Sequence, residues 1–380
     1  MLRPLLVAAL AVLTATACAA AGTAEPTVPH GFSIEKIASV RDARELAMAP
    51  SGDLFVGSGG SEVYIVARAD ARQPDPPRIF ARIDDAPVAG VALSDNALFV
   101  GGQFGVYRIP YHAGDVHASS APEKLAAVRT SGISRDHQTT SLAWNGRALY
   151  ASVGSSCNGC KPELDATRAT IQRVNVATHR LTPIALHIRN AIALAIRPRT
   201  GALWAGVAGI DDLQPGHPYE IFDDVTSHHL PVDYGWPTCY ENRKVHPKWP
   251  GDCSHTPIPR VVFPAYETPI GAVFYPGNPH GRYAFPASYR GGAFVTLHGS
   301  WHDFGGLVPP RVVFVPFRNG SPIHPVNWSN PDAQWSQFVA GYQSGPTDRI
   351  GRPTGITVGP DGSLFVADDL SGAIYRIRPR

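Results

Sequence analysis

Several polar residues whose chemistry could form a site stand beside short apolar runs that recur along the 380-residue chain. A histidine can accept a proton near neutral pH, an arginine can bind an anionic group, and an aspartate or a loop carbonyl can bind a hard cation. The candidates are Arg44 in ARELAM, His137 in DHQTTSLAW, Arg189 and Asn190 in HIRNAIAL, Asp211 in VAGIDD, His298 and Trp301 in LHGSW, and Arg352 in GRPTGITV. Each of them, taken alone, is more often a surface or structural residue than a functional one. A shared position relative to a repeated element would direct all of them toward one axis, so the repeat decides their meaning.

The apolar runs form an internal repeat. Its copies are DLFVGSGG, ALFVGGQ, ALYASVG, ALWAGVAG, AFVTLHGS and SLFVADD. Each copy is a β-rich run that enters a Gly or Asp turn, and most are followed by a second strand such as SEVYIV or GAIYRIRP. Leu54, Leu98, Leu149 and Leu203 lie 44, 51 and 54 residues apart, close to the roughly 40 to 50 residues of a propeller repeat.

Six such units predict an all-β chain in which residues 31–380 form one six-bladed β-propeller of four-stranded antiparallel blades. A β-sandwich, or two separate β domains, is the alternative, but neither explains six similar units. The strand GFSIEKI near Gly31 is expected to pair with the last blade, because closure of the ring removes exposed strand edges. A segment rich in Pro, His and aromatic residues, about 212–260, is expected to form a loop excursion on one face. In propellers, ligands usually sit at one mouth of the central channel, which is where the polar candidates would meet.

The first residues, 1–25, have the pattern of an export signal. Arg3 precedes an apolar run from Leu5 to Leu13, and small residues follow. The run is too short to span a bilayer, which needs about 20 apolar residues. Cys18 follows Ala15-Thr16-Ala17, a position that leaves both lipoprotein-type cleavage with a lipid anchor and ordinary secretion open. We therefore expect an exported protein, periplasmic or secreted, with or without membrane anchoring through Cys18.

Four cysteines remain once Cys18 is set aside. They are Cys157, Cys160, Cys239 and Cys253. An even number in an oxidising compartment favours disulfides over a zinc site or a redox-active dithiol. Four cysteines permit three connectivities, and the short separations favour Cys157 with Cys160 and Cys239 with Cys253. A zinc site with four cysteine ligands would require both pairs to meet in space.

The composition limits the class of partner. The formal net charge is +2 and no long basic run is present, so nothing in the charge distribution favours a nucleic-acid partner. The chain contains 37 glycines and 36 prolines, which favour many turns and short strands over long helices.

A family resemblance runs from about Gly31 to Arg380. It is carried by DHQTTSLAWNGRALYASVGSSCNGC, DATRATIQRVN, HIRNAIAL, DYGWPTCY, PIGAVFYPGN, FVTLHGSW and GRPTGITVGPDGSLFVADDLSGAIYRI. These runs resemble the glucose/sorbosone dehydrogenase family, and most of all its L-sorbosone and pyranose dehydrogenase branch. The resemblance implies a six-bladed propeller that uses pyrroloquinoline quinone (PQQ) and calcium to oxidise a sugar at an aldehyde or hemiacetal carbon. Electrons would then pass to an external acceptor.

The resemblance also implies roles for the candidates. His137 matches the general base that removes the proton of the substrate hydroxyl, and Arg189 matches the arginine that stabilises charge on the quinone oxygen. PQQ carries three carboxylates, which calls for several cations and a stacking surface. The implied cofactor-binding set is Arg44, Asn190, His298, Trp301 and Arg352, and calcium is expected at loop carbonyls near Gly209 and at Asp211. A cysteine pair at SSCNGC is a further feature of the family.

The chain departs from the family pattern at three places. His302-Asp303 stand where the branch often has Asn-Arg after HGSW, and Ile210 stands where an arginine usually precedes Asp211. After His137 the usual Trp-Thr-Arg is Gln-Thr-Thr. These changes remove cations from the expected site, so they bear on substrate choice and on PQQ binding.

An alternative function from another class therefore stays open. It is a non-catalytic exported propeller that binds a carbohydrate or a protein partner on its decorated face. A metal-dependent lactonase on the same fold is less favoured, because too few carboxylate and Asn ligands occur at matching positions.

Overall fold

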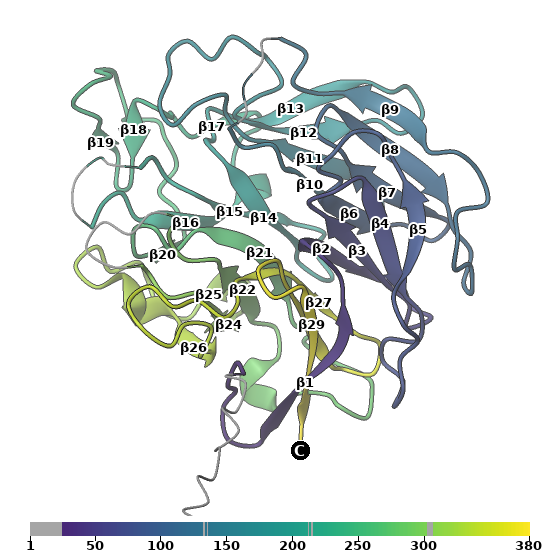
Figure 1. Cartoon of the computed structure of the whole chain (residues 1–380). Helices are drawn as coiled ribbons and strands as arrows, with labels where there is room; N and C mark the ends of the chain where they lie inside the picture. Colours follow the sequence, from purple (N-terminus) through teal and green to yellow (C-terminus); the bar gives the residue numbers. More distant parts are fainter. Residues whose placement is uncertain (1–24, 132–133, 135, 212, 214–215, 302–306) are drawn as a thin grey trace, which may run out of the picture.

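Six β-sheets surround a common central axis in the computed structural model (Figure 1). The structure describes residues 25–131, 134, 136–211, 213, 216–301 and 307–380. Each sheet contains the four strands of one blade, which pair antiparallel, and in five of the blades these four strands occur in chain order from the axis outward. The sixth blade takes its outermost strand from the start of the chain. The protein is an all-β, six-bladed propeller of four-stranded antiparallel blades, as its repeats predict.

Each blade has four strands, ordered from the axis outward. Blade 1 consists of β2 (Ala43–Met48), β3 (Leu54–Ser58), β4 (Glu62–Val66) and β5 (Arg78–Arg82), and blade 2 of β6 (Gly90–Leu93), β7 (Ala97–Gly101), β8 (Gly105–Pro110) and β9 (Glu123–Ala127). Blade 3 consists of β10 (Thr140–Trp144), β11 (Leu149–Val153), β12 (Thr170–Val174) and β13 (Leu181–Leu186), and blade 4 of β14 (Ala191–Ile196), β15 (Leu203–Val207), β16 (Glu220–Asp224) and β20 (Val261–Phe263). Blade 5 consists of β21 (Pro269–Phe274), β22 (Ala293–Leu297), β23 (Arg311–Val315) and β26 (Ser336–Val339), and blade 6 of β27 (Pro353–Val358), β28 (Leu364–Asp368), β29 (Ala373–Pro379) and β1 (Phe32–Ser39).

The repeated apolar phrases are the second strands of the blades. Every residue of β3, β7, β11, β15, β22 and β28 is buried. Adjacent blades cover both faces of these strands, which is why the phrases are continuously apolar and do not alternate. One interblade cluster, for example, joins Leu54 and Val56 of blade 1 to Phe365 and Ala367 of blade 6.

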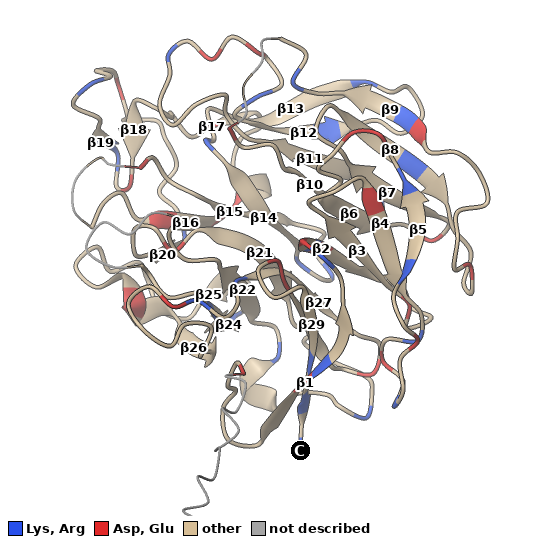
Figure 2. Cartoon of the chain, viewed as in Figure 1, with Lys and Arg blue, Asp and Glu red and all other residues tan. Residues whose placement is uncertain are grey.

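The first strand of each blade lines the axis, and the chain comes close to itself there. A Cβ atom added at Gly90 would lie 2.0 Å from the carbonyl oxygen of Thr140 in the next blade, and one at Gly355 would lie 2.3 Å from that of Arg44. Only glycine permits this approach. Among these six inner strands, all of whose residues are described, only β2 carries charged residues, Arg44 and Glu45 (Figure 2).

The ring closes where β1 pairs antiparallel with β29. The register runs from Phe32 opposite Pro379 to Ser39 opposite Ala373. The prediction that the segment near Gly31 completes the last blade is confirmed.

Long connections extend from blade 4 and differ in detail from the predicted excursion at 212–260. Strand β16 lies inside that range and belongs to the blade. Its sequence, EIFDD, is too acidic to be recognised as a buried strand. In the structure Asp223 is buried, and its carboxylate is hydrogen-bonded to Tyr234 and His228. The rest of the excursion follows in 225–260, with η1 (Val225–Ser227), β17 (Val232–Asp233), β18 (Cys239–Tyr240) and β19 (Lys244–Val245). Strand β17 pairs parallel with β13 as a fifth strand of blade 3.

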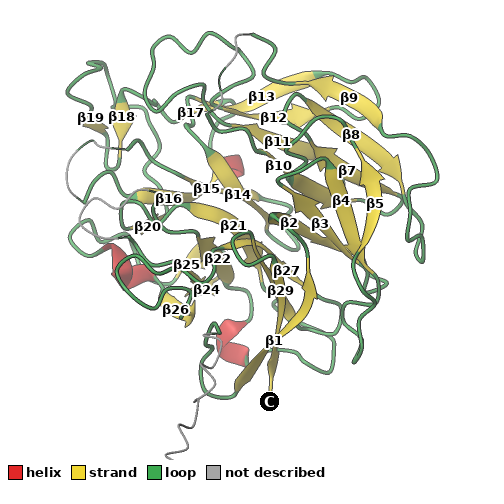
Figure 3. Cartoon of the chain, in the orientation of Figure 1, coloured by secondary structure: helices red, strands yellow, loops and turns green. Residues whose placement is uncertain are grey.

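The remaining elements are small (Figure 3). They are the hairpin of β24 (Phe317–Arg318) and β25 (Ser321–Pro322) and the 3-10 turns η2 (Ala287–Tyr289) and η3 (Pro331–Gln334). The described helices are single 3-10 turns, and none has the length or apolar character needed to span a bilayer. The two expected disulfides, Cys157–Cys160 and Cys239–Cys253, are both formed. The predicted signal at 1–25, with Cys18, lies outside the described residues except for Glu25.

Candidate active site

The predicted site residues gather at one end of the propeller, the mouth, where the inner strands begin and the second strand of each blade turns into the third. Antiparallel pairing places these two kinds of turn at the same end of a blade. Arg44 lies in β2, His137 precedes β10, Arg189 and Asn190 precede β14, and Arg352 precedes β27. Asp211 follows β15, and His298 and Trp301 follow β22. The shared position that the sequence suggested therefore exists.

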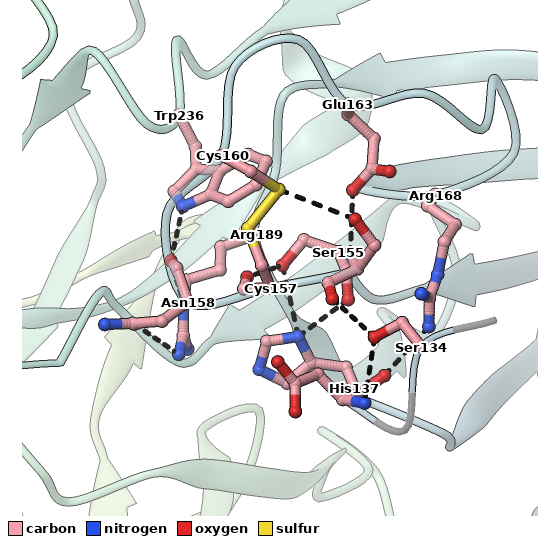
Figure 4. Close-up of a disulfide and its surroundings, with 12 residues drawn as sticks. Ser134, His137, Ser155, Cys157, Asn158, Cys160, Glu163, Arg168, Arg189 and Trp236 are labelled. Carbon is pink, nitrogen blue, oxygen red and sulfur yellow. Dashed lines mark hydrogen bonds between the residues drawn. A yellow bond between two sulfur atoms is a disulfide. The ribbon is translucent and has the colours of Figure 1, made fainter. Parts of the chain in front are cut away.

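His137 is held in one orientation by Ser155 (Figure 4). Its Nδ1 lies 2.9 Å from the carbonyl oxygen of Ser155 and 3.1 Å from the hydroxyl of the same residue. A carbonyl oxygen only accepts hydrogen bonds, so Nδ1 carries the proton and Nε2 keeps its lone pair. Burial, together with the positive charge of Arg189, lowers the pKa of His137 to about 3. The imidazole is therefore uncharged at neutral pH and presents a proton-accepting nitrogen.

The loop that carries His137 is tightly fixed. His137 has a positive φ of 49°, a conformation that non-glycine residues adopt rarely. Arg129, which is 5% exposed, donates through Nη2 to the carbonyl oxygens of His137 and Thr139, each at 2.7 Å. Arg168 donates through Nη2 to the carbonyl of Asp136 at 2.8 Å. Two arginines outside the predicted set thus hold the backbone on both sides of the imidazole.

Asn190 lies next to His137. A Cβ atom added at Gly154 would lie 2.4 Å from Cβ of His137 and 2.6 Å from Oδ1 of Asn190. The glycine in ALYASVG therefore leaves the space in which these two side chains meet. Asn190 is itself buried.

Arg189 is 6% exposed, and all its donor nitrogens are bonded. Nε donates to the carbonyl of Asn158 at 3.1 Å and Nη1 to the carbonyl of Ala208 at 3.2 Å. Nη2 donates to Oδ1 of Asn158 at 2.9 Å and pairs with Oδ2 of Asp211 at 3.1 Å. Burial lowers the pKa of Arg189, and the carboxylate of Asp211 opposes that effect. The guanidinium is thus a fixed positive charge near His137.

A second cluster stands across the mouth and is organised by Asp369. Its carboxylate pairs with Nη1 of Arg44 at 2.9 Å and accepts from Nε2 of His298 at 3.1 Å. Arg44 also donates to Oγ1 of Thr139 at 3.2 Å, which connects this cluster to the His137 loop. Arg352 donates through Nε to the carbonyl of His298 at 3.2 Å and through Nη2 to that of Gly299 at 3.1 Å. Burial lowers the pKa of His298 to about 4, so this ring is also uncharged at neutral pH.

The remaining candidates lie at the edge of the mouth. Trp301 is 70% exposed, in the loop that follows β22. Ile210, which replaces the expected arginine, is buried against Gly159 and Trp249, since both side chains lie within 3 Å of a Cβ added at that glycine. His302 and Asp303 lie outside the described residues.

The chain matches known proteins along its length. Residues 242–380 match the model of the TrAA12-like family. An uncharacterized protein of Borreliella burgdorferi is 22% identical over 373 residues, which cover 92% of this chain and 90% of that protein.

The solved structures that share the fold include a Trichoderma reesei enzyme and a Coprinopsis cinerea domain. An iodide structure of a Trichoderma reesei enzyme of carbohydrate-active enzyme family AA12 superposes with a TM-score of 0.79 at 19% identity, over 96% of this chain and 100% of that chain. The holo form of the pyranose dehydrogenase PQQ domain from Coprinopsis cinerea gives 0.78 at 17% identity, over 93% and 97% of the two chains. The predicted resemblance is confirmed. The propeller is similar in fold to the family whose motifs its sequence carries, including the pyranose dehydrogenase branch.

The residues of the mouth fit the anionic cofactor that the family implies. Burial lowers the pKa of Arg352 to about 10; the charge of Asp369 opposes this effect, and the charges of Arg349 and Arg44 add to it. The charge of Arg189 acts in the same way on His137. Arg44 and Arg189 are already paired with Asp369 and Asp211, and the three carboxylates of PQQ would further stabilise the charged forms of these buried arginines.

The calcium ligands expected near Gly209 have less support. In the described part of the chain, no three His, Cys, Asp or Glu side chains are grouped so that they could hold a metal ion. The carboxylate of Asp211 already pairs with Arg189. The amide of Gly209 donates to Oε2 of Glu220 at 2.6 Å, and burial raises the pKa of Glu220 to about 8, so this carboxyl is mostly protonated at neutral pH. A calcium ion at this loop would depend on backbone carbonyls and would share Asp211 with Arg189.

Proposed function

We propose that the protein is an exported sugar oxidoreductase that uses PQQ and calcium, and that His137 is its general base. The observation that carries this proposal is the environment of His137, whose Nδ1 donates to Ser155, so that Nε2 keeps the lone pair that can accept a proton beside Asn190 and Arg189. The fold shared with a pyranose dehydrogenase PQQ domain supports the same class of reaction. The substrate class is an aldose or a sorbosone-like aldehyde, oxidised at its hemiacetal or aldehyde carbon.

PQQ, when bound, supplies the acceptor for the hydride of the substrate. In this chain Arg44 and Arg352 would bind its carboxylates, and the charge of Arg189 would lie near the quinone oxygen. Asn190 and His298 would donate or accept hydrogen bonds, and Trp301 would cover it. The calcium ion would add a Lewis acid near Gly209 and Asp211.

The chain's own residues perform the proton transfer and the charge stabilisation. His137 accepts the hydroxyl proton of the sugar at Nε2, and Ser155 stabilises the imidazolium through the hydrogen bond at Nδ1. Arg189 places a fixed positive charge where negative charge develops, an effect often worth about 3 kcal/mol. Burial and, after it, the charge of Arg189 disfavour a proton on His137, and an anionic ligand would offset the charge of Arg189, so His137 becomes a stronger base when that ligand is bound.

The test is titration of the purified protein with PQQ in the presence of calcium, followed by dye reduction with a panel of aldoses. His137→Ala is the test variant, and His112→Ala is the matched control, because the His112 side chain is 77% exposed in a turn of blade 2. We expect PQQ binding in all three proteins and sugar-dependent reduction that is lost only in His137→Ala. If the folded wild-type protein does not bind PQQ, the dehydrogenase proposal fails, and a non-catalytic propeller that binds carbohydrate or protein becomes the better interpretation.

A further inference from the structure

Asn158 contacts both Arg189, as Figure 4 shows, and Asp211. It lies inside the loop closed by the Cys157–Cys160 disulfide. Its Oδ1 accepts from Nη2 of Arg189 at 2.9 Å and from the backbone amide of Asp211 at 2.8 Å, and its Nδ2 donates to the carbonyl of Asp211 at 3.1 Å. Its own carbonyl accepts from Nε of Arg189 at 3.1 Å. One side chain thus connects the fixed cation of the mouth to the loop expected to bind calcium.

The carboxamide is the group that these contacts require. It presents an acceptor and a donor side by side, so it pairs with both the N–H and the C=O of Asp211, as a neighbouring β-strand would. A carboxylate would accept from the amide of Asp211 but would face its carbonyl oxygen with a second acceptor. The carboxamide is also neutral. It orients the guanidinium of Arg189 without cancelling its charge, whereas an aspartate would add a second carboxylate beside Asp211.

The loop that carries Asn158 is anchored on both sides. The amide of Ser155 donates to the carbonyl of Arg189 at 2.8 Å, and the hydroxyl of Ser155 donates to the carbonyl of Cys157 at 2.7 Å. On the other side, Nε1 of Trp236 donates to the carbonyl of Asn158 at 3.2 Å. The disulfide closes the chain between these anchors, so the backbone at Asn158 has little freedom to move.

We propose that Asn158 is a positioning residue that holds the guanidinium of Arg189 in register with the Gly209–Asp211 loop. Its effect on catalysis rests on the proposed function, since Arg189 and that loop act only when cofactor and metal are bound. Its effect on the position of the Gly209–Asp211 loop does not depend on the proposed function. The amide of Asp211 is protected by Oδ1 of Asn158 whether or not any ligand binds.

Asn158→Ala and Asn158→Asp test the proposal, with Asn145→Ala as the matched control. Asn145 makes a comparable set of bonds in the turn between β10 and β11, because its Oδ1 accepts from the amides of Arg147 and Ala148 and its Nδ2 donates to the carbonyl of Gly201 at 3.1 Å. That turn lies at the end of blade 3 opposite the mouth. Hydrogen exchange of the peptide that contains Asp211 measures the positioning directly. PQQ affinity, and the separate changes in kcat and KM, measure its consequence.

Relative to the wild type, we expect the hydrogen-exchange rate of the Asp211 amide to rise about ten-fold or more in Asn158→Ala and to stay unchanged in Asn145→Ala. PQQ affinity should fall about ten-fold in Asn158→Ala, which corresponds to roughly 1.4 kcal/mol, and further in Asn158→Asp. In both variants kcat should fall more than KM rises. Unchanged exchange at Asp211 in Asn158→Ala would overturn the positioning role. Failure of the wild type to bind PQQ would instead refute the proposed function, and the exchange measurement would still decide the role of Asn158.

Discussion

Arg44 and Asp369 form an ion pair of 2.9 Å across the junction of the first and last blades, although they are 325 residues apart in the chain. The same carboxylate accepts from Nε2 of His298. Two residues of the proposed cofactor-binding set, Arg44 of blade 1 and His298 of blade 5, therefore depend for their placement on a residue of blade 6. Burial alone would raise the pKa of Asp369, but the bond from His298 and the charges of Arg44 and Arg352 outweigh it and lower the pKa below its ordinary value.

Asp369→Asn should destabilise the fold in a pH-dependent manner. At pH 7 the variant should lose about 1 to 3 kcal/mol of unfolding free energy, because an amide accepts hydrogen bonds but carries no charge for Arg44. A carboxyl whose pKa is lowered by folding stabilises above its unfolded pKa and loses that effect as pH falls through its folded pKa. The difference between the two proteins should therefore shrink below pH 3.8, the ordinary value. Urea denaturation at pH 7 and at pH 3 measures it, and equal stability at pH 7 would contradict the role given to the pair.

His137 should remain neutral in the ligand-free protein throughout the physiological pH range. Burial and the charge of Arg189 lower its pKa to about 3, and the Ser155 carbonyl fixes the proton on Nδ1. A 15N-edited NMR titration of the histidine side chains, with His137→Ala to assign the signal, should show an Nδ1–H tautomer that does not change between pH 5 and 8. Addition of PQQ should raise that pKa, since its carboxylates offset Arg189. A titration midpoint near 6.5 without ligand would show that the imidazole is solvated and not held as described.

Glu45 should make stability fall as pH rises. It lies on β2 at the axis, where Oε2 accepts from the amides of Val91 and Leu142 at 3.3 Å each, and the Ser141 side chain lies beside its carboxyl group. Burial raises its pKa to about 8. A carboxyl whose pKa is raised by folding binds more protons in the folded state between pH 4.5 and 8, so stability declines across that interval by up to about 1.4 kcal/mol per unit.

Glu45→Gln removes this titration while keeping the shape of the side chain. The unfolding free energy of the wild type relative to the variant should therefore decrease between pH 5 and pH 9. Chemical denaturation at pH 5, 7 and 9 gives the comparison. Parallel pH profiles for the two proteins would mean that Glu45 is charged, and thus paired or hydrated, at neutral pH.

The two disulfides should differ in what their removal costs. The Cys157–Cys160 bridge closes a shorter stretch of chain than the Cys239–Cys253 bridge, with sequence separations of 3 and 14. In the chain-entropy model the two bridges contribute about 2 and about 3 kcal/mol, respectively, to the free energy of unfolding. Replacing both cysteines by serine should therefore lower the melting temperature less for Cys157–Cys160.

Activity should follow the opposite order, because the shorter bridge holds the loop of Ser155 and Asn158, which orient His137 and Arg189. Melting curves of the two double variants rank their loss of stability, and steady-state rates rank their loss of activity. A larger loss of activity on removing Cys239–Cys253 would place the functional constraint in the blade 4 excursion instead.

The fold could be predicted because the repeated blades produce a repeated sequence pattern. Second strands such as LFVGS and LFVAD are buried on both faces, so each copy is continuously apolar and ends at the same kind of turn. Residues next to those copies, including His137 and Arg352, could be assigned to one mouth from position alone. Strand β16 could not be recognised within the expected excursion, because its sequence ends in two aspartates, as a loop often does. In the structure these aspartates bond to the neighbouring loop.

The residues that organise the mouth could not be predicted. Asp369, Asn158 and Arg129 act through partners on other blades or in other loops, and nothing in their immediate sequence marks those partners. Asp369 stands at the expected turn in SLFVADD, so its proximity to the mouth was accessible, but not its ion pair with Arg44. Asn158 stands between two cysteines whose bridge could be foreseen, whereas its bonds to Arg189 and Asp211 depend on how blades 3 and 4 meet.

The pairing of β1 with β29 also determines when the molecule can finish folding. Until β29 has been made, β1 has no strand beside it and β28 lacks its outer neighbour, so the nascent chain is an open arc with two unpaired edges. Such edges pair readily with those of other molecules. A chain shortened by only the few residues of β29 would therefore be expected to self-associate, even though it retains every residue proposed to take part in catalysis.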